Sequence, residues 1–369
     1  MNNKIIDLFA GVGGFSVGFE KAGFVASKAV EFDDKIAAIY AINHPQTKLF
    51  VDDIGKINNS DNFSTNEVEV IIGGPPCQGF SMAGARIRQN SFVDDPRNYL
   101  FKQYLKVVQI VKPKVFIIEN VKGILSMNNG DIFKEIIKVF SDPDNFGGDK
   151  YYLHYKLVKA VEFGVPQKRE RVIIIGCKNK DYDFESYLSL AKAEVIKIYP
   201  SFYKKVTLKE AIGNLPSPTE DGIIDNPEPE TEYQKFLSSK SKTITNHTKY
   251  ELTQKALNRI KQIKPGENFT VLKEEIHSVH SGSYGRLEWN GVAPTITTRF
   301  DTPSGGQFTH PDEDRMITPR EAARIQSFPD DFVFEGTKSI ICKTIGNAVP
   351  PKIAFTFAYM VKELLKDEH

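Results

Sequence analysis

The sequence predicts an α/β protein with a mostly parallel, doubly wound sheet, helices on both faces and a second, smaller domain. Three observations predict this fold. Over the first 180 residues, short apolar runs alternate with segments whose apolar residues recur three and four positions apart. A glycine-rich turn follows the first apolar run, as in sheets that bind ligands at their strand ends. From about Lys180 the alternation gives way to irregular, proline-punctuated sequence.

Each short apolar run in the first part of the chain is expected to form one strand. The runs are Lys4 to Phe9, Val25 to Phe32, Lys48 to Ile54, Val68 to Gly73, Lys114 to Glu119, Tyr152 to Ala160 and Arg171 to Cys177. Helices are expected between them at Gly14 to Ala22, Asp34 to Asn43, Tyr99 to Val111 and Ile132 to Phe140. Strands that alternate with helices pair in parallel, so these runs should form one sheet.

Regular structure is expected again near the end of the chain. Thr318 is a good helix N-cap, with proline after it and Glu321 three residues on, and a last helix should span Pro351 to Leu365. We therefore predict a catalytic domain of residues 1–180 plus 329–369, and a second domain of residues 181–328.

Composition limits the classes of protein that are possible. The 369 residues are 40% hydrophobic, which is enough for a sizeable core, and the net charge of +1 argues neither for nor against nucleic acid. With no long apolar run or signal peptide, we expect a soluble, cytoplasmic protein without membrane contact. Three widely spaced cysteines suggest neither disulfides nor a metal site.

The first three strands end in residues suited to a nucleoside ligand. Gly11 and Gly13 allow a tight turn and close backbone approach, but their spacing is not that of a dinucleotide-binding turn. Glu31 follows about 20 residues later, where an acid can accept hydrogen bonds from ribose hydroxyls. Asp53 and Ile54 end the third strand. These residues could simply be a turn and solvated acids, but their common position at strand ends suggests an adenosyl cofactor.

The fourth strand runs into Gly-Gly-Pro-Pro-Cys77-Gln-Gly-Phe-Ser. A lone cysteine is usually a small buried hydrophobe. Cys77 differs because it lies in a polar, glycine-rich loop at the carboxyl end of a strand, where a nucleophile would be accessible. Cys177 and Cys342 lie within apolar runs, and we assign both to structural roles.

The remaining candidates flank the next strands. Glu119 ends a buried strand, where partial desolvation favours the protonated form and makes it a candidate acid. Arg169 and Arg171 precede the run Val172 to Gly176, and strand alternation would send both to the same side. Charged residues beside a strand are commonly only solvated, but here they enter at the edge that carries the site.

Six ordered motifs resemble the cytosine-5 DNA methyltransferase family, in particular its bacterial restriction-modification members. They are Asp7 to Phe15, Pro75 to Ser81, Glu119 to Val121, Gln167 to Arg171, Arg320 to Pro329 and Gly346 to Pro350. The resemblance spans both ends of the chain and omits mainly residues 180–285. It implies the Rossmann-like fold of S-adenosylmethionine-dependent methyltransferases and methylation of carbon 5 of cytosine in duplex DNA.

The resemblance also implies residue roles. Cys77 matches the thiol that adds to carbon 6 of cytosine, Glu119 the acid at ring nitrogen 3, and Arg171 the residue at oxygen 2, with Arg169 in the same cluster. Eight residues match contacts of S-adenosylmethionine, namely Phe9, Gly11, Gly13, Glu31, Asp53, Ile54, Pro75 and Asn347. From the residues alone, Asn347 would be read as a turn residue.

DNA contacts are expected from two segments. The family's enzymes flip the target base out of the duplex, and the segment Gln78 to Arg97 matches the loop that closes over DNA. Residues 181–328 match the position of the domain that reads the sequence. Two loops in it, Ser281 to Arg286 and Thr295 to Arg299, look suited to face a groove. A basic run could neutralise phosphates or be a solvated surface, and comprises Lys240, Lys242, His247, Lys249, Lys255, Arg259, Lys261 and Lys264.

Other functions stay open at this point. One branch of the same family methylates transfer RNA, and an inactive DNA-binding member would keep the fold, although the intact Cys77, Glu119 and Arg171 disfavour it. A nicotinamide dehydrogenase is disfavoured by the glycine spacing. We expect a monomer, with a cognate restriction endonuclease that acts on the same site without a stable complex.

Overall fold

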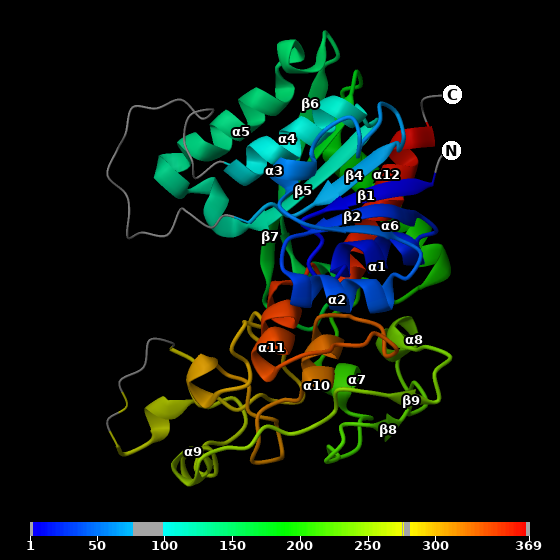
Figure 1. Ribbon diagram of the computed structural model, residues 1–369. Coiled ribbons are helices and arrows are strands. Elements are labelled where there is room, and N and C mark those ends of the chain that lie inside the picture. The colour runs from blue at the N-terminus through cyan, green and yellow to red at the C-terminus, as the bar shows by residue number, and fades with distance from the viewer. Residues whose placement is uncertain (1–2, 77–98, 275, 277–280, 367–369) are drawn as a thin grey trace.

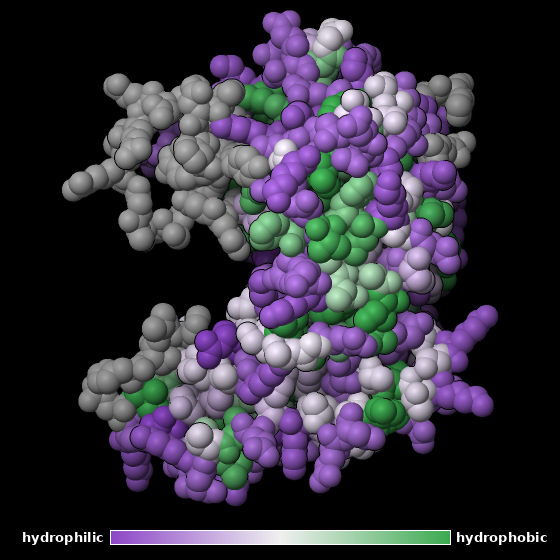
Figure 2. Space-filling model, viewed as in Figure 1, coloured by the Kyte–Doolittle hydropathy of each residue, from purple (hydrophilic) through white to green (hydrophobic). Residues whose placement is uncertain are grey.

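The computed structural model describes residues 3–76, 99–274, 276 and 281–366. The chain forms two lobes (Figure 1), and Figure 2 shows the surface hollowed between them. The larger lobe is built on a seven-stranded sheet in the order β3-β2-β1-β4-β5-β7-β6. Its strands are β1 Lys4–Leu8, β2 Val25–Glu31, β3 Lys48–Val51, β4 Val70–Gly73, β5 Val115–Val121, β6 Tyr151–Lys159 and β7 Glu170–Lys178. All the predicted strands are confirmed, with bounds shifted at their ends.

One strand of the sheet runs against the others. Neighbouring strands are parallel from β3 to β5, whereas β7 is antiparallel to both β5 and β6. As a result β7 begins where β5 ends, and Arg171 pairs with Val121. The mostly parallel sheet is confirmed, and the reversal of β7 places its first residues at the carboxyl edge of the parallel strands.

Helices cover both faces of the sheet, as predicted. One face carries α1 (Gly14–Lys21), α2 (Asp34–Asn43), α6 (Phe184–Ile198) and α12 (Pro351–Lys366). The other face carries α3 (Ile54–Ile57), α4 (Tyr99–Val111) and α5 (Asp131–Ser141). Strand alternation separates the two cores, because Ile117 points to the first and Ile118 to the second. The sequence did not predict α6, which packs against α12 and extends the larger lobe beyond residue 180.

The second lobe, which follows α6, contains little regular structure among its described residues. Its elements are α7 Leu208–Ile212, β8 Ile224–Asp225, α8 Glu232–Leu237, β9 Thr243–Ile244, α9 Gln254–Ile260 and α10 Pro319–Ile325. The chain then returns to the sheet through α11 (Lys338–Asn347). Short 3-10 turns lie in the larger lobe at Lys122–Leu125, Met127–Gly130, Pro143–Phe146 and Ala160–Phe163. Two more lie in the second lobe, at Phe269–Val271 and Pro303–Gly305. The core on the α1 and α12 face continues into this lobe through Phe236 and Phe308, so the lobes share apolar packing.

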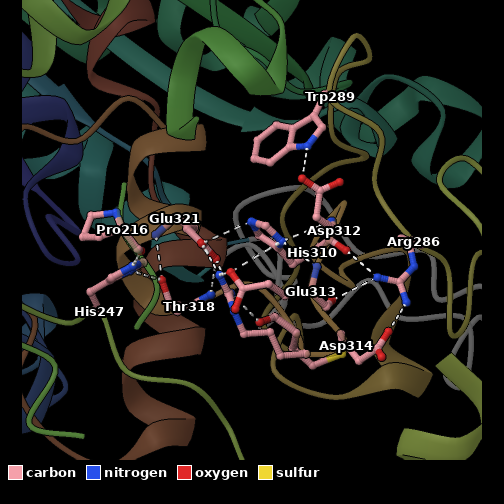
Figure 3. Close-up of polar contacts among 12 residues, drawn as sticks. Pro216, His247, Arg286, Trp289, His310, Asp312, Glu313, Asp314, Thr318 and Glu321 are labelled. Atoms are coloured by element: carbon pink, nitrogen blue, oxygen red, sulfur yellow. Dashed lines mark hydrogen bonds and ion pairs between the residues drawn. The ribbon is translucent and has the colours of Figure 1, made fainter. Parts of the chain in front are cut away.

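A buried polar network takes the place of regular structure in the second lobe (Figure 3). Thr318 caps α10 in a reciprocal pair with Glu321, which confirms the predicted helix start. Glu321 is 1% exposed and accepts hydrogen bonds of 2.9 and 2.8 Å from Arg315. His247 contacts Thr318 at 2.9 Å, and His310 lies 3.8 Å from Glu321. Burial raises the pKa of Glu321, but Arg315 outweighs that effect and the pKa is about 2.

Candidate active site

A cavity of about 790 Å³ lies at the carboxyl ends of β1, β2, β4 and β5, beside the start of β7. Its wall contains nine predicted site residues, which are Phe9, Gly11, Glu31, Asp53, Ile54, Pro75, Glu119, Arg171 and Asn347. Gly13 and Arg169 are not part of this wall. Cys77 and the segment Gln78 to Arg97 lie outside the described residues.

The turn after β1 depends on backbone conformations that favour glycine. Gly11 and Gly13 have φ angles of 57° and 90°. A Cβ atom on Gly13 would lie 2.2 Å from Nε2 of His44, so glycine is needed where the end of α2 packs against the turn. Phe9 has a φ angle of 58° although it is not glycine, which costs about 1 kcal/mol. Surrounding packing must offset this strain to hold Phe9 in the cavity wall.

The acids after β2 and β3 are fixed by backbone donors. Glu31 accepts hydrogen bonds of 2.9 Å from the amides of Gly11 and Asp33, one on each carboxylate oxygen. Burial raises the pKa of Glu31, while these amides lower it. Asp53 caps α3 through its side chain, and Ile54 behind it is 3% exposed. Both acids are thus oriented before any ligand binds.

An acid and an arginine face each other at the opposite wall. Nε of Arg171 lies 2.9 Å from Oε1 of Glu119, and the side chains are 16% and 11% exposed. Oε1 is buried, and its close contact with Arg171 is an ion pair rather than an aligned hydrogen bond. Asn120 donates a 2.9 Å hydrogen bond to the carbonyl of Pro75. This bond ties the end of β5 to the backbone two residues before Cys77.

Arg169 contacts backbone rather than the cavity. Its side chain is buried and donates hydrogen bonds of 2.9, 3.4 and 2.9 Å to the carbonyls of Gly346, Asn347 and Ala348. Burial and the nearby charge of Arg171 lower its pKa to about 9. A cation is therefore held in the interior to fix the loop that brings Asn347 to the cavity.

Negative charge dominates the cavity wall. Its described carboxyl groups are those of Asp7, Glu31, Asp33, Asp52, Asp53 and Glu119, and its cations are Arg171 and Lys343. Lys343, at 46% exposure, forms a 3.0 Å ion pair with Asp33, at 33%. This pair joins α11 to the N-terminus of α2 across 310 residues of sequence.

Sequence analysis missed several residues of the wall, among them Asp7, Phe32 and Lys343. Phe32 could have been found from the sequence, since it directly follows the strand-end acid Glu31. In the structure it is 74% exposed, which is unusual for a large aromatic side chain. Lys343 could not have been found in this way, because its partner is distant in sequence. Cys177 and Cys342 are both buried, in agreement with their assignment to structural roles.

The expected DNA-facing residues of the second lobe are only partly accessible. Arg286 is 5% exposed and donates to the carbonyls of Ile260 and Ile263, so its expected place facing a groove is wrong. His247 is fully buried and Arg259 is paired with Glu274, so neither is free to bind phosphate. Six residues of the basic run remain exposed, namely Lys240, Lys242, Lys249, Lys255, Lys261 and Lys264.

Comparison with known proteins shows which family this chain belongs to. Residues 3–363 match the C-5 cytosine-specific DNA methylase family. The chain belongs to this family. Among its relatives, the type II methyltransferase M1.HphI of Haemophilus parahaemolyticus is 32% identical, with 100% of this chain and 89% of the relative covered. The type II methyltransferase M.DdeI of Desulfomicrobium norvegicum is 35% identical over 96% and 87%.

Solved structures agree with this membership. A crystal structure of a DNA modification methyltransferase encoded in an Escherichia coli prophage superposes with a TM-score of 0.73 at 27% identity, covering 98% and 99% of the two chains. As a member of this family, the present protein transfers a methyl group to carbon 5 of cytosine in DNA. Methylation of transfer RNA and an inactive DNA-binding role are not favoured. In the part of the chain that the structure describes, no helix is long and apolar enough to span a bilayer.

Proposed function

We propose that this methyltransferase modifies one cytosine within a specific duplex DNA sequence, using S-adenosylmethionine, as the modification half of a restriction-modification pair. The observation that supports this most strongly is the shared cavity. The acids at the ends of β2 and β3 and the Glu119–Arg171 pair line the same cavity. Type II names among the relatives support the restriction-modification setting.

The cavity suits an adenosyl cofactor in size and chemistry. A volume of about 790 Å³ lies within the usual range of small-molecule sites. Glu31 would accept from ribose hydroxyls, because each of its oxygens carries one backbone hydrogen bond and keeps a free lone pair. Asp53, Ile54 and Phe9 would hold the base. When bound, the cofactor supplies an electrophilic methyl group on a sulfonium.

We assign the target-base wall as follows. The thiolate of Cys77 adds to carbon 6 of the flipped cytosine, which makes carbon 5 nucleophilic. The carboxyl group of Glu119 donates a hydrogen bond to ring nitrogen 3, where negative charge would otherwise build up. Arg171 holds exocyclic oxygen 2 and keeps Glu119 in place. After methylation, loss of the carbon 5 proton releases Cys77 by elimination.

Three residues act on the site through backbone. Asn120 fixes the carbonyl of Pro75, and Arg169 fixes the loop of Asn347. Gly13 lets the turn close against His44. We therefore place Arg169 as a positioning residue, although the sequence put it with the catalytic group.

The second lobe reads the DNA in this proposal. Packing of α6 on α12 favours a boundary after α6, near residue 199, in place of residue 180. Arg299 is exposed in a loop held at its start by Thr295, whose hydroxyl donates to the carbonyl of Lys168. That bond connects a candidate base-reading loop to the strand of Arg171. We further propose a cytoplasmic monomer that forms no stable complex with its endonuclease.

A covalent trap tests the chemistry. Duplex DNA that carries 5-fluorocytosine at the target position should form a denaturant-stable adduct with the wild type in the presence of S-adenosylmethionine, because fluorine cannot leave as the proton does. Cys77→Ala should form none, and Cys342→Ala is the matched control that keeps it. The target position must be known before this duplex is made, and it is found by sequencing methylated DNA from a host that expresses the protein. Labelled methyl transfer to transfer RNA in preference to duplex DNA would contradict the proposed substrate.

A further inference from the structure

Asp7 is a buried carboxyl group in the cavity wall that the proposed function leaves without a role. It is 1% exposed and lies at the end of β1. Ser16 donates a 2.6 Å hydrogen bond to Oδ2 of Asp7, and the same hydroxyl lies 3.0 Å from the hydroxyl of Tyr40. These contacts place one carboxyl group between the first turn of α1 and the cavity.

The groups that face Asp7 from neighbouring elements make its negative charge costly. Glu20 of α1 and Glu31 of β2 repel it, and Tyr40 of α2 and Tyr104 of α4 are neutral phenols. No basic side chain among the described residues pairs with it. Burial raises the pKa of Asp7 to about 7; the Ser16 hydrogen bond opposes this rise, and both glutamates add to it.

The reaction changes the charge inside this cavity. The methyl donor carries a sulfonium charge that its product, S-adenosylhomocysteine, lacks, so each turnover removes one positive charge from the cavity. Interactions between charges are strong where water is excluded. A buried carboxyl group without a basic partner therefore has the sulfonium as a counter-charge only while the donor is bound.

We propose that Asp7 distinguishes methyl donor from product by charge: its proton leaves to solvent when the sulfonium cofactor binds, and it is retaken once the sulfonium is gone. The inference rests on the proposed cofactor. When the donor binds, Asp7 loses one proton and the cavity gains one sulfonium charge. The total charge of the cavity is therefore unchanged by donor binding. Glu31 is another acid of the wall whose pKa burial raises and backbone amides lower, whereas burial raises the pKa of Asp7 to about 7.

Proton linkage gives the size of the expected effect. Affinity for the donor should rise with pH, by up to tenfold per unit while Asp7 is protonated in the free protein. Between pH 6 and pH 8 we expect the Kd of S-adenosylmethionine to fall about tenfold. The Kd of S-adenosylhomocysteine should change less than about twofold, since the neutral sulfur offers Asp7 no counter-charge.

Calorimetry of the full chain tests this, with both ligands titrated at pH 6, 7 and 8 in buffers of different ionisation heat. Donor binding at pH 6.5 should release a proton, visible as a buffer-dependent heat, and product binding should not. Asp7→Asn keeps the acceptor for Ser16 and should abolish the pH dependence. Asp301→Asn removes a 7% exposed acid outside the cavity wall, and should keep it.

A second variant protects the test against a folding defect in Asp7→Asn. Ser16→Ala removes the hydrogen bond that lowers the pKa of Asp7, so the pH midpoint for donor binding should move upward. Parallel pH profiles for donor and product, or an unchanged midpoint in Ser16→Ala, would overturn the inference. If neither ligand binds the wild type at any pH, the proposed cofactor itself is wrong.

Discussion

Replacement of Arg169 by methionine separates stability of the fold from binding of the cofactor. The change removes the hydrogen bonds that fix the carbonyls of residues 346–348 and leaves an apolar side chain of similar length. Restricting the backbone of one residue costs about 1 kcal/mol. Ordering the three released residues on binding would thus cost ~3 kcal/mol, which is roughly a hundredfold in Kd.

The same substitution should change global stability little. The guanidinium of Arg169 is buried, with a pKa lowered to about 9 mainly by that burial, so its charge is itself costly in the folded state. Loss of this costly charge offsets part of the cost of leaving the carbonyls of residues 346–348 without their donors. We expect a melting temperature within about 3 °C of the wild type, which corresponds to ~2 kcal/mol for a chain of this length.

Calorimetry with S-adenosylhomocysteine and a thermal melt measure the two quantities. Arg169→Lys keeps the charge and one donor position and should fall between wild type and Arg169→Met. Arg286→Met is the matched control, because it removes a buried, carbonyl-binding guanidinium from the second lobe. It should leave product affinity unchanged. The reasoning fails if Arg169→Met binds within twofold of the wild type.

Three further predictions concern the cavity rim, the turn and the second lobe. Lys343→Gln and Asp33→Asn should each weaken cofactor binding about two- to fivefold, as expected for a partly exposed ion pair, and the double variant should lose no more. Lys338→Gln is the control, because Lys338 lies on the same helix as Lys343 but pairs with Asp301, and it should have no effect on Kd. Gly13→Ala should destabilise the turn and raise the cofactor Kd at least tenfold, because its Cβ would clash with His44; wild-type affinity in that variant would contradict the packing argument. Burial lowers the pKa of His247 and His310 below 6.5, so the unfolded chain takes up protons first as pH falls. Their contribution to stability is complete above about pH 6.5 and declines below it; thermal melts at pH 7.5 and 5.5 should show a smaller decline in His310→Gln, and equal declines would refute this origin.

Much of the site could be predicted because of one geometric rule. Residues that follow parallel strands meet at one edge of the sheet, so Glu31, Asp53 and Pro75 could be placed together from strand periodicity alone. Asn347 could not. It reaches the cavity because Arg169 holds its loop, and nothing in the local sequence records a contact across 178 residues.

Charge patterns predicted less than strand patterns. Arg286 and His247 lie in basic or polar sequence that suits a DNA surface, yet both are buried and bonded to backbone or to Thr318. A lobe with few helices and strands must satisfy many backbone carbonyls by other means, and arginine has enough donors to do so. Sequence composition cannot distinguish this use of arginine from phosphate binding.

The catalytic wall depends on the direction of β7 rather than on spacing. If β7 ran parallel to β5, its first residues would lie at the opposite edge of the sheet, far from the end of β5. Because it runs antiparallel, Arg171 pairs with Val121 and its side chain reaches Glu119. The same reversal starts β7 beside the loop of Asn347, which Arg169 holds. Two arginines that lie two residues apart at the entry of β7 therefore serve different halves of the site in our proposal, one facing the target base and the other supporting the cofactor loop. A substitution that shifted the register of β7 by one residue would turn both side chains away from their present partners, and should lose base binding and cofactor binding together.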